Sequence, residues 1–266
     1  MAVITISRDL GSGGREVGRT LAANTGYRYL DHEEILTRVK SAGNKWEKWA
    51  QDFDEHSPRL WEKYDWSYRG YVALIQSIIM EEAVRDRVVV MGRGANYLLR
   101  DTPFALSIRV VAPFAAKVSR LADREAIDRD SARWLIEKTD RERAGFLYTV
   151  YGRDGKSPSD YDMAFDSGTT PIADIIEAIQ KRIPETDRLK DEQALNALQA
   201  KALAAKIKAR LLTGLPFFMP TLEVNYDGEN IMVRAVIRLR ERERVVTEAK
   251  ALAGSAPLKF ELRYRQ

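Results

Sequence analysis

The first residues of the chain that could do chemistry form a glycine-rich stretch. Its glycines are Gly11, Gly13 and Gly14; an apolar, β-branched run at residues 3–6 precedes them and helical spacing at residues 15–25 follows. Glycines between a buried strand and a helix let backbone N–H groups approach an anion, and the helix start adds partial positive charge. The stretch therefore predicts a phosphate-binding loop, or only a tight turn between strand and helix.

The stretch departs from a complete P-loop, which reads Gly, four residues, Gly-Lys-Ser/Thr. In that alignment Asp9 replaces the first glycine, Arg15 replaces the lysine, and Glu16 replaces the magnesium-holding hydroxyl. Arginine still suits a phosphate, because it is permanently charged and binds phosphate bidentately. The metal ligand stays open between water, Ser12 and a carboxylate, and Glu16 is better explained as an acid favoured at a helix start.

Predicted strands and helices that alternate along the chain must position this loop. Most of the strand candidates are continuous apolar runs, which are typical of a parallel sheet covered on both faces. Helical patterns separate them, so the fold class expected is an α/β, P-loop NTPase-type parallel sheet flanked by helices. The predicted strands are residues 3–6, 27–30, 88–91, 106–111 and 163–166, and the predicted helices are residues 71–85, 114–124, 130–140 and 171–182.

Residues 41–70 interrupt the alternation. Four tryptophans lie there among charged residues, at positions 46, 49, 61 and 66. We interpret this segment as a helical insertion whose aromatic residues form its own core.

Composition narrows the chemistry further. The chain has 266 residues, no cysteine and two histidines, which excludes disulfides, thiol nucleophiles and multi-histidine metal sites. No leader-like start and no run long enough to span a membrane is present, so we expect a cytoplasmic protein. The net charge of +4 lies entirely in residues 184–266, because residues 1–183 are balanced. That asymmetry indicates two units.

The carboxy-terminal region predicts a small α+β domain over residues 184–266. A helix at 187–212 precedes alternating residues at 222–226 and 231–237, which are joined by an Asp227-Gly228 turn typical of a hairpin. A helix at 243–252 and a strand at 260–264 complete an αββαβ order, which resembles a BON-type domain.

Five arginines lie close together in this region: Arg234, Arg238, Arg240, Arg242 and Arg244. A basic face for lipid, nucleic acid or an acidic protein partner is one hypothesis. Alternation with Glu241 and Glu243 favours the other, a self-paired and solvated helix start.

Several segments together resemble one known family. ITISRDLGSGGREVGRTLA, YRYLDHEEI, VVVMGRGANYLL, KTDRERAGF and SDYDMAFDSGTTPIADIIEAI follow one another as in the cytidylate kinase-like family of P-loop nucleoside monophosphate kinases. The resemblance spans residues 1–183. It implies ATP and Mg²⁺ as cofactors and a nucleoside monophosphate, CMP or dCMP, as acceptor.

The resemblance also implies roles for individual residues. Asp31, Arg93 and Lys117 would bind the acceptor nucleotide. His32 and Gly94 depart from the pattern beside Asp31 and Arg93. Converging cations are what phosphoryl transfer requires, because its transition state spreads negative charge over the equatorial oxygens. Taken singly, each arginine is better explained by a surface ion pair, but their joint placement with the loop favours the site. The resemblance places five residues around the ATP phosphates: Gly11, Ser12, Gly13, Gly14 and Arg15. It places four residues in a lid-like region at 114–150: Lys117, Arg120, Asp140 and Arg143. The catalytic residues that it implies are Arg15, Arg120, Asp140 and Arg143.

The sequence is also compatible with two alternatives to a nucleotide kinase. Asp9, Glu16 and Gly94 are compatible with a nucleotide-binding regulatory protein that has little or no kinase activity. A non-nucleotide small molecule is also possible as acceptor, because a fold does not fix its substrate.

Overall fold

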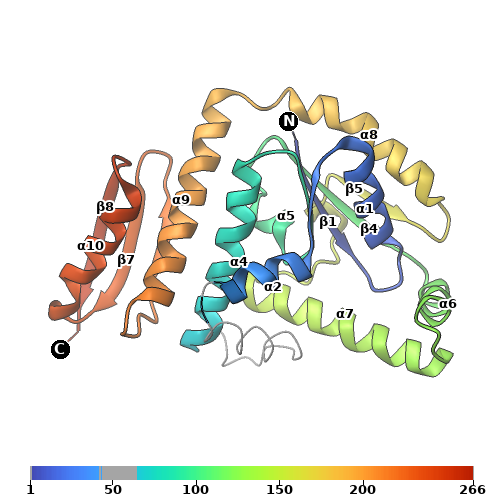
Figure 1. Cartoon of the computed structure of the whole chain (residues 1–266), viewed down its shortest axis with the longest axis horizontal. Helices are drawn as coiled ribbons and strands as arrows, with labels where there is room; N and C mark the ends of the chain where they lie inside the picture. Colours follow the sequence, from blue (N-terminus) through green and yellow to red (C-terminus); the bar gives the residue numbers. More distant parts are fainter. Residues whose placement is uncertain (1, 42, 44–64, 266) are drawn as a thin grey trace. The chain divides into compact units, whose positions relative to one another are not determined.

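The structure is a computed structural model that describes residues 2–41, 43 and 65–265 (Figure 1). The described residues form two compact units. The first comprises residues 2–35 and 85–190, and the second comprises residues 36–41, 43, 65–84 and 191–265.

A five-stranded parallel sheet forms the centre of the first unit, in the order β2-β3-β1-β4-β5. Residues 3–7 of β1 and all of β3 are buried, so both faces of these two strands are covered, whereas β4 alternates buried Leu106, Ile108 and Val110 with half-buried residues. This confirms the α/β fold class predicted from the sequence. The strands are β1 (Val3–Arg8), β2 (Arg28–Leu30), β3 (Val88–Met91), β4 (Ala105–Val111) and β5 (Met163–Asp166).

Two helices pack with one face of this sheet in a shared core, α1 (Gly14–Thr25) and α8 (Ile172–Asp187). Helices α6 (Phe114–Glu125) and α7 (Arg129–Tyr151) pair through a second apolar cluster. The short α5 (Ala95–Leu98) follows β3, and α2 (His32–Ser41) follows β2.

Two helices are longer than the sequence predicted. Helix α7 begins where the Asp128 carboxylate accepts hydrogen bonds from the N–H groups of Asp130 and Ser131, and it runs eleven residues past the predicted end at 140, to Tyr151. Helix α8 continues through the boundary predicted between residues 183 and 184, even though Pro184 lies inside it.

The described part of the predicted insertion is helical at its end. Helix α4 (Trp66–Val84) begins five residues before the helix predicted at 71–85, while the tryptophans at 46, 49 and 61 lie outside the described residues. Within the second unit α4 packs along α9 (Glu192–Gly214), and the Trp66 indole donates to the carbonyl of Leu212 at 2.6 Å. The core of the second unit therefore includes a helix that precedes residue 184.

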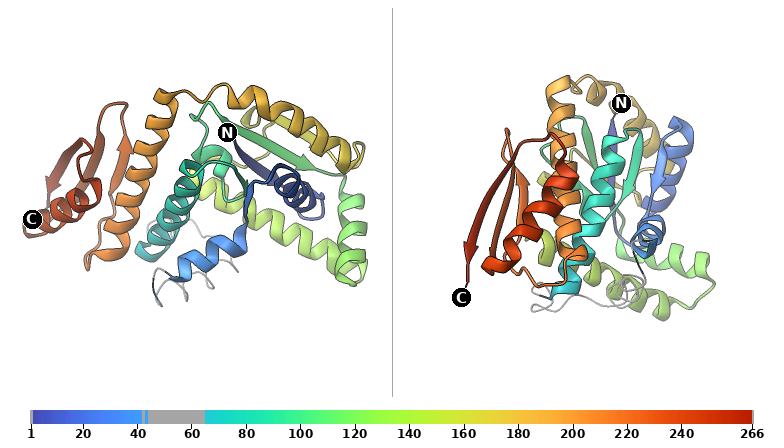
Figure 2. Two further views of the ribbon diagram at one scale, coloured as in Figure 1. Left: turned by 45° about the horizontal axis from the view of Figure 1, so that its top comes forward. Right: turned by 60° about the vertical axis from the view of Figure 1, so that its left-hand side comes forward.

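The second unit has the predicted αββαβ order. After α9 come β6 (Glu223–Tyr226), β7 (Ile231–Ile237), α10 (Arg242–Ala253) and β8 (Leu258–Tyr264). Strands β6 and β7 form an antiparallel hairpin, while β7 and β8 are parallel and joined through α10. Figure 2 shows α9 and α10 beside the three strands.

The alternating charges at the start of α10 predicted ion pairs between neighbouring arginines and glutamates, and this prediction is wrong. Arg240, Arg242 and Arg244 are exposed, and among the described residues none of them forms an ion pair. Glu241 is instead buried and accepts a hydrogen bond from the Arg238 N–H at 2.8 Å, which caps the chain as it turns into α10.

Within the described ranges, no helix is both long and apolar enough to cross a membrane.

Candidate active site

The glycine-rich stretch forms the turn between β1 and α1. Gly11 and Gly13 have φ values of 80° and 77°, a region that favours glycine. A Cβ atom on Gly11 would lie 2.6 Å from the carbonyl oxygen of Lys117, so helix α6 approaches the loop too closely for any other residue. The first turn of α1 follows directly and presents N–H groups that have no partner within the helix.

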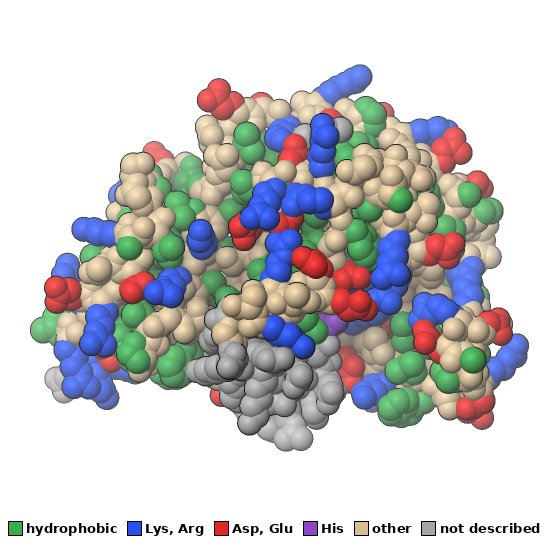
Figure 3. Space-filling model, viewed as in Figure 1, with side chains coloured by type: hydrophobic (Ala, Val, Ile, Leu, Met, Phe, Trp, Pro, Cys, Tyr) green, Lys and Arg blue, Asp and Glu red, His purple; other side chains and the backbone are tan. Residues whose placement is uncertain are grey.

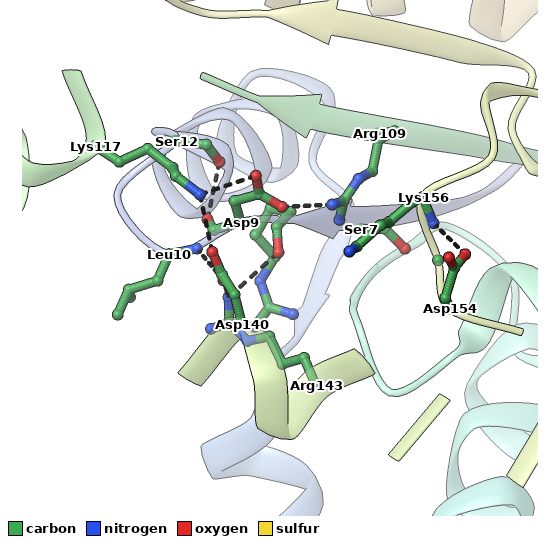
Figure 4. A network of polar contacts seen from close by, with 12 residues as sticks. Ser7, Asp9, Leu10, Ser12, Arg109, Lys117, Asp140, Arg143, Asp154 and Lys156 are labelled. Atoms are coloured by element: carbon green, nitrogen blue, oxygen red, sulfur yellow. Dashed lines mark hydrogen bonds and ion pairs between the residues drawn. The ribbon is translucent and has the colours of Figure 1, made fainter. Parts of the chain in front are cut away.

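An ion-pair network surrounds the loop (Figure 4). The Asp9 carboxylate pairs with Arg109 and with Lys117, whose Nζ lies 3.2 Å away. Lys117 also lies 2.9 Å from the Asp140 carboxylate, which accepts a hydrogen bond from the Leu10 N–H at 2.9 Å. Although burial alone would lower it, the carboxylates of Asp140 and Asp9 raise the pKa of Lys117. Two predicted site residues, Lys117 and Asp140, thus hold the loop in place.

Arg120 supports the loop through an intermediate residue. Its guanidinium donates to the hydroxyl and to the carbonyl of Ser167, both at 2.7 Å, and the Ser167 hydroxyl donates to the Ser12 carbonyl at 2.7 Å. Ser12 itself is fully buried and its hydroxyl donates to the Asp9 carbonyl at 2.9 Å. Among the described residues, the polar groups of Arg120 and Ser12 are therefore engaged in the framework of the loop.

Arg15 points to the residues that follow β2. Its guanidinium lies 2.8 Å from Glu33 and 3.9 Å from the buried Asp31, and Arg19 lies 3.8 Å from the same Asp31 carboxylate. Burial acts against it, but the hydrogen bond to Glu33 raises the pKa of Arg15. The structure thus brings Arg15 to the predicted acceptor side instead of into the glycine loop.

Arg93 lies on the same side. Its Nε is 3.1 Å from Nδ1 of His32, and its carbonyl accepts a hydrogen bond from the Tyr151 hydroxyl at 3.3 Å. Gly94 follows with φ 69°, and a Cβ atom there would overlap the Tyr151 ring. The ring of Tyr151 therefore gives a physical reason for the glycine at position 94.

Sequence reasoning missed Arg8, the last residue of β1. The Arg143 guanidinium donates to the Arg8 carbonyl at 3.2 Å and lies 3.6 Å from Asp140. Burial, followed by the positive charges of Arg143 and Arg93, lowers the pKa of Arg8 well below its usual value. Burial also lowers the pKa of Arg143, with Arg93 adding to the effect and Asp140 opposing it. A charged residue ending a buried strand just before a glycine loop was the available signal.

Comparison with known proteins assigns the amino-terminal part of the chain. Residues 3–169 match the model of the cytidylate kinase-like family. The chain belongs to that family. A cytidylate kinase from Thermoplasma acidophilum is 28% identical over 186 residues, which are 70% of this chain and 94% of that protein. A crystal structure of an uncharacterised protein from Eubacterium ventriosum shares the fold with a TM-score of 0.56 and 21% identity, covering 69% of this chain and 99% of that one.

The predicted residues of this cytidylate kinase-like site divide into two groups. One group lies at the glycine loop: Gly11, Ser12, Gly13, Gly14, Lys117, Arg120, Asp140 and Arg143. The other group follows β2 and β3: Arg15, Asp31 and Arg93. Since β1, β2 and β3 are parallel, both groups lie at the carboxyl edge of one sheet, where ligands of such folds bind.

The side chains around the loop do not fit a magnesium ion held by the protein. Within the described ranges no group of three or more His, Asp or Glu residues could hold a metal ion. The carboxylates of Asp9 and Asp140 are paired with cations, and Glu16 is exposed in the first turn of α1.

Proposed function

We propose that this member of the cytidylate kinase-like family transfers a phosphoryl group from ATP to a nucleoside monophosphate, CMP or dCMP. The observation that carries the proposal is the convergence of a glycine loop with Arg8, Arg93 and Arg143 at one edge of the parallel sheet. The similarity to a protein named as a cytidylate kinase supports the choice of acceptor.

In the proposed reaction the chain's residues mainly position and neutralise charge. The loop amides and the start of α1 would bind the ATP phosphates, and Arg143 would neutralise the phosphoryl group in transfer. Asp31 and Arg93 would bind the acceptor, with Arg15 beside them. No covalent intermediate is needed, because the acceptor oxygen attacks the phosphoryl group directly.

Magnesium would accompany ATP in this proposal. Mg²⁺ keeps several water ligands and is bound largely through substrate phosphates in kinase sites. The ion would supply additional neutralisation of the phosphates when bound, and no role of a residue proposed above depends on coordinating it.

The second candidate function is nucleotide-dependent regulation without efficient transfer. One observation favours it: the Asp9 and Asp140 carboxylates lie at the loop itself, and Asp140 accepts the Leu10 N–H. Negative charge at this position opposes phosphate binding unless Lys117 and Arg109 neutralise it.

A coupled ADP-release assay tests the proposal. Purified full-length protein is mixed with ATP, magnesium and each of CMP, dCMP, UMP and AMP, beside a control without acceptor. Turnover with CMP or dCMP well above the control is expected, and Arg143→Ala should abolish it while Arg182→Leu, an exposed arginine on α8, should not. ATP binding without acceptor-dependent ADP release would favour the regulatory function, and release with a non-nucleotide alcohol would favour a different acceptor.

For the carboxy-terminal residues 184–266 we propose a BON-like module that contacts a partner. Its support is the αββαβ order and the exposed Arg238, Arg240, Arg242 and Arg244. On the face drawn in Figure 3, basic and acidic side chains are interspersed, so the electrostatic attraction to such a partner would be modest. Co-sedimentation with anionic lipid vesicles, compared with neutral ones, tests a lipid partner first, and retention on immobilised RNA tests a nucleic acid. Cytoplasmic location stays a prediction.

The division predicted from the sequence between residues 183 and 184 is tested by a chain that ends at residue 183. Because α4 packs along α9 within the second unit, we expect this truncation to uncover apolar surface on α4 and to reduce solubility. A well-folded, monodisperse product would support the division made from the sequence.

A further inference from the structure

The side chain of Arg8 occupies the space next to Gly14. A Cβ atom on Gly14 would lie 2.5 Å from Cβ and 3.1 Å from Cγ of Arg8, so position 14 has no room for a side chain while Arg8 is present. Gly14 does not have a positive φ, which means that its backbone would accept another residue. The neighbouring Arg8 therefore accounts for the glycine.

The guanidinium of Arg8 extends from there to the loop after β3. A Cβ atom on Gly92 would overlap Nη1 of Arg8, so the guanidinium lies against the backbone of Gly92. Gly92 follows β3 directly, and Arg8 ends β1, which pairs with β3 in parallel. The charged group consequently lies at the carboxyl edge of the sheet, beside the first turn of α1.

Arg8 differs in its partners from the other cations around the loop. Lys117, Arg109 and Arg120 each have a carboxylate or carbonyl partner. Within the described part of the chain, the Arg8 guanidinium makes no hydrogen bond and no ion pair. The charges that act on it most strongly are those of Arg143 and Arg93, which repel it.

Such an arrangement is unfavourable by itself. A partly buried guanidinium has lost part of its hydration, and two neighbouring positive charges add repulsion. An anion with several oxygens would relieve both, because a guanidinium has five N–H donors in a planar fork that matches phosphate.

We propose that Arg8 binds the terminal phosphates of the nucleotide and takes the part that the lysine has in a complete P-loop. Gly14 is glycine because the Arg8 side chain crosses the place that a side chain from the helix would need. This inference rests on the proposed function, since it takes ATP as the ligand of the loop. It assigns to the end of β1 a role that the sequence alignment gave to Arg15.

Isothermal titration of the full-length protein with ATP tests the inference. Arg8→Leu is expected to weaken ATP binding about 10- to 100-fold, the effect of losing charge-assisted hydrogen bonds. Arg8→Lys should lose less, and Arg182→Leu, which removes an exposed arginine paired with Glu185, should lose nothing. Adenosine, which has no phosphate, should bind Arg8→Leu and the unaltered protein equally.

A double variant tests most directly whether a lysine on α1 can replace Arg8. Arg8→Gly clears the space beside position 14, and Gly14→Lys then places a lysine at the start of α1. The pair should recover most of the ATP affinity that Arg8→Gly loses, whereas Gly14→Lys alone should lower it through the clash with Arg8. Recovery would support the inference, and a double variant no better than Arg8→Gly would contradict the exchange of roles.

Pyrophosphate, titrated in parallel, separates this inference from the proposed function. Pyrophosphate binding that needs Arg8, in a protein without CMP-dependent turnover, would keep the inference and reject the kinase. Unchanged ATP and pyrophosphate affinity in Arg8→Leu would overturn the inference even if CMP is phosphorylated. Melting temperatures are also measured without nucleotide, and Arg8→Leu should not be less stable than the unaltered protein. A clear fall in its melting temperature, combined with unchanged ATP affinity, would give Arg8 a structural role instead.

Discussion

Arginines in the two units of this protein have different surroundings. In the first unit, the Arg8 guanidinium lacks a hydrogen-bond or ion-pair partner among the described residues, and burial with the charges of Arg143 and Arg93 lowers its pKa. In the second unit, the exposed Arg234 is 2.7 Å from Glu261, and the hydrogen bond to that carboxylate raises its pKa. Charge that is already neutralised or hydrated offers little to a ligand. The count of arginines, which is high in both units, therefore says less about function than their partners do.

The largest expected effect is on catalysis at the unneutralised arginine. We expect Arg8→Leu to lower kcat/KM for ATP by about 10²-fold, the scale of losing one preorganised group that stabilises a developing charge. Arg234→Leu should leave this constant unchanged. The measurement is the ADP-release assay with CMP as acceptor. Equal losses in the two variants would remove the distinction between the regions.

A core substitution in the second unit should affect stability rather than nucleotide binding. Leu211 is fully buried in the cluster of α9 with the three strands. Leu211→Ala is expected to lower the free energy of unfolding by about 3 kcal/mol through lost contacts and a cavity. Urea denaturation measures this loss, and ATP titration below the transition should give an unaltered affinity. A large loss of ATP affinity would show that the two regions do not act separately.

The paired cation at the loop predicts a pH dependence. Asp140 and Asp9 raise the pKa of Lys117 above its ordinary value despite burial. A raised pKa in the folded state means that the stabilisation is complete below the ordinary pKa of lysine and is lost as the pH rises through the folded value. Lys117→Met should therefore be less stable than the unaltered protein at neutral pH, and the difference should shrink at strongly alkaline pH. Thermal melts from pH 7 to about pH 12, past the ordinary pKa of lysine, measure it, and a constant difference over that range would contradict the assigned ion pairs.

The smallest effect is expected at the exposed pair of the second unit. Arg234→Leu removes one partner of Glu261 on a solvated face of the sheet, and exposed ion pairs contribute little to stability. We expect no measurable change in melting temperature. A clear destabilisation would mean that paired surface arginines matter more here than the comparison with Arg8 assumes.

Local sequence patterns were enough to predict much of the fold. The strands around the glycine loop, the Asp227-Gly228 hairpin turn and the αββαβ order are confirmed because apolar periodicity and turn residues act over a few neighbouring positions. The ends of α7 and α8 were less well predicted, since helices continue where tertiary packing supports them.

By itself the sequence determined the parallel sheet, the glycine loop and some of the cations beside it, Lys117, Arg120 and Arg143, but it missed Arg8 and Arg109. Only the tertiary structure decided which residues the predicted cations contact: Arg15 pairs with Glu33, and Arg120 supports the loop through Ser167. It also decided that the ring of Tyr151 fills the space beside Gly94. The physical reason is distance along the chain. Asp9 pairs with Arg109 one hundred residues away, and the Leu10 N–H donates to Asp140 across 130. Periodicity places each side chain on its own element, but the charged residues around the loop meet their partners because folding brings distant elements together.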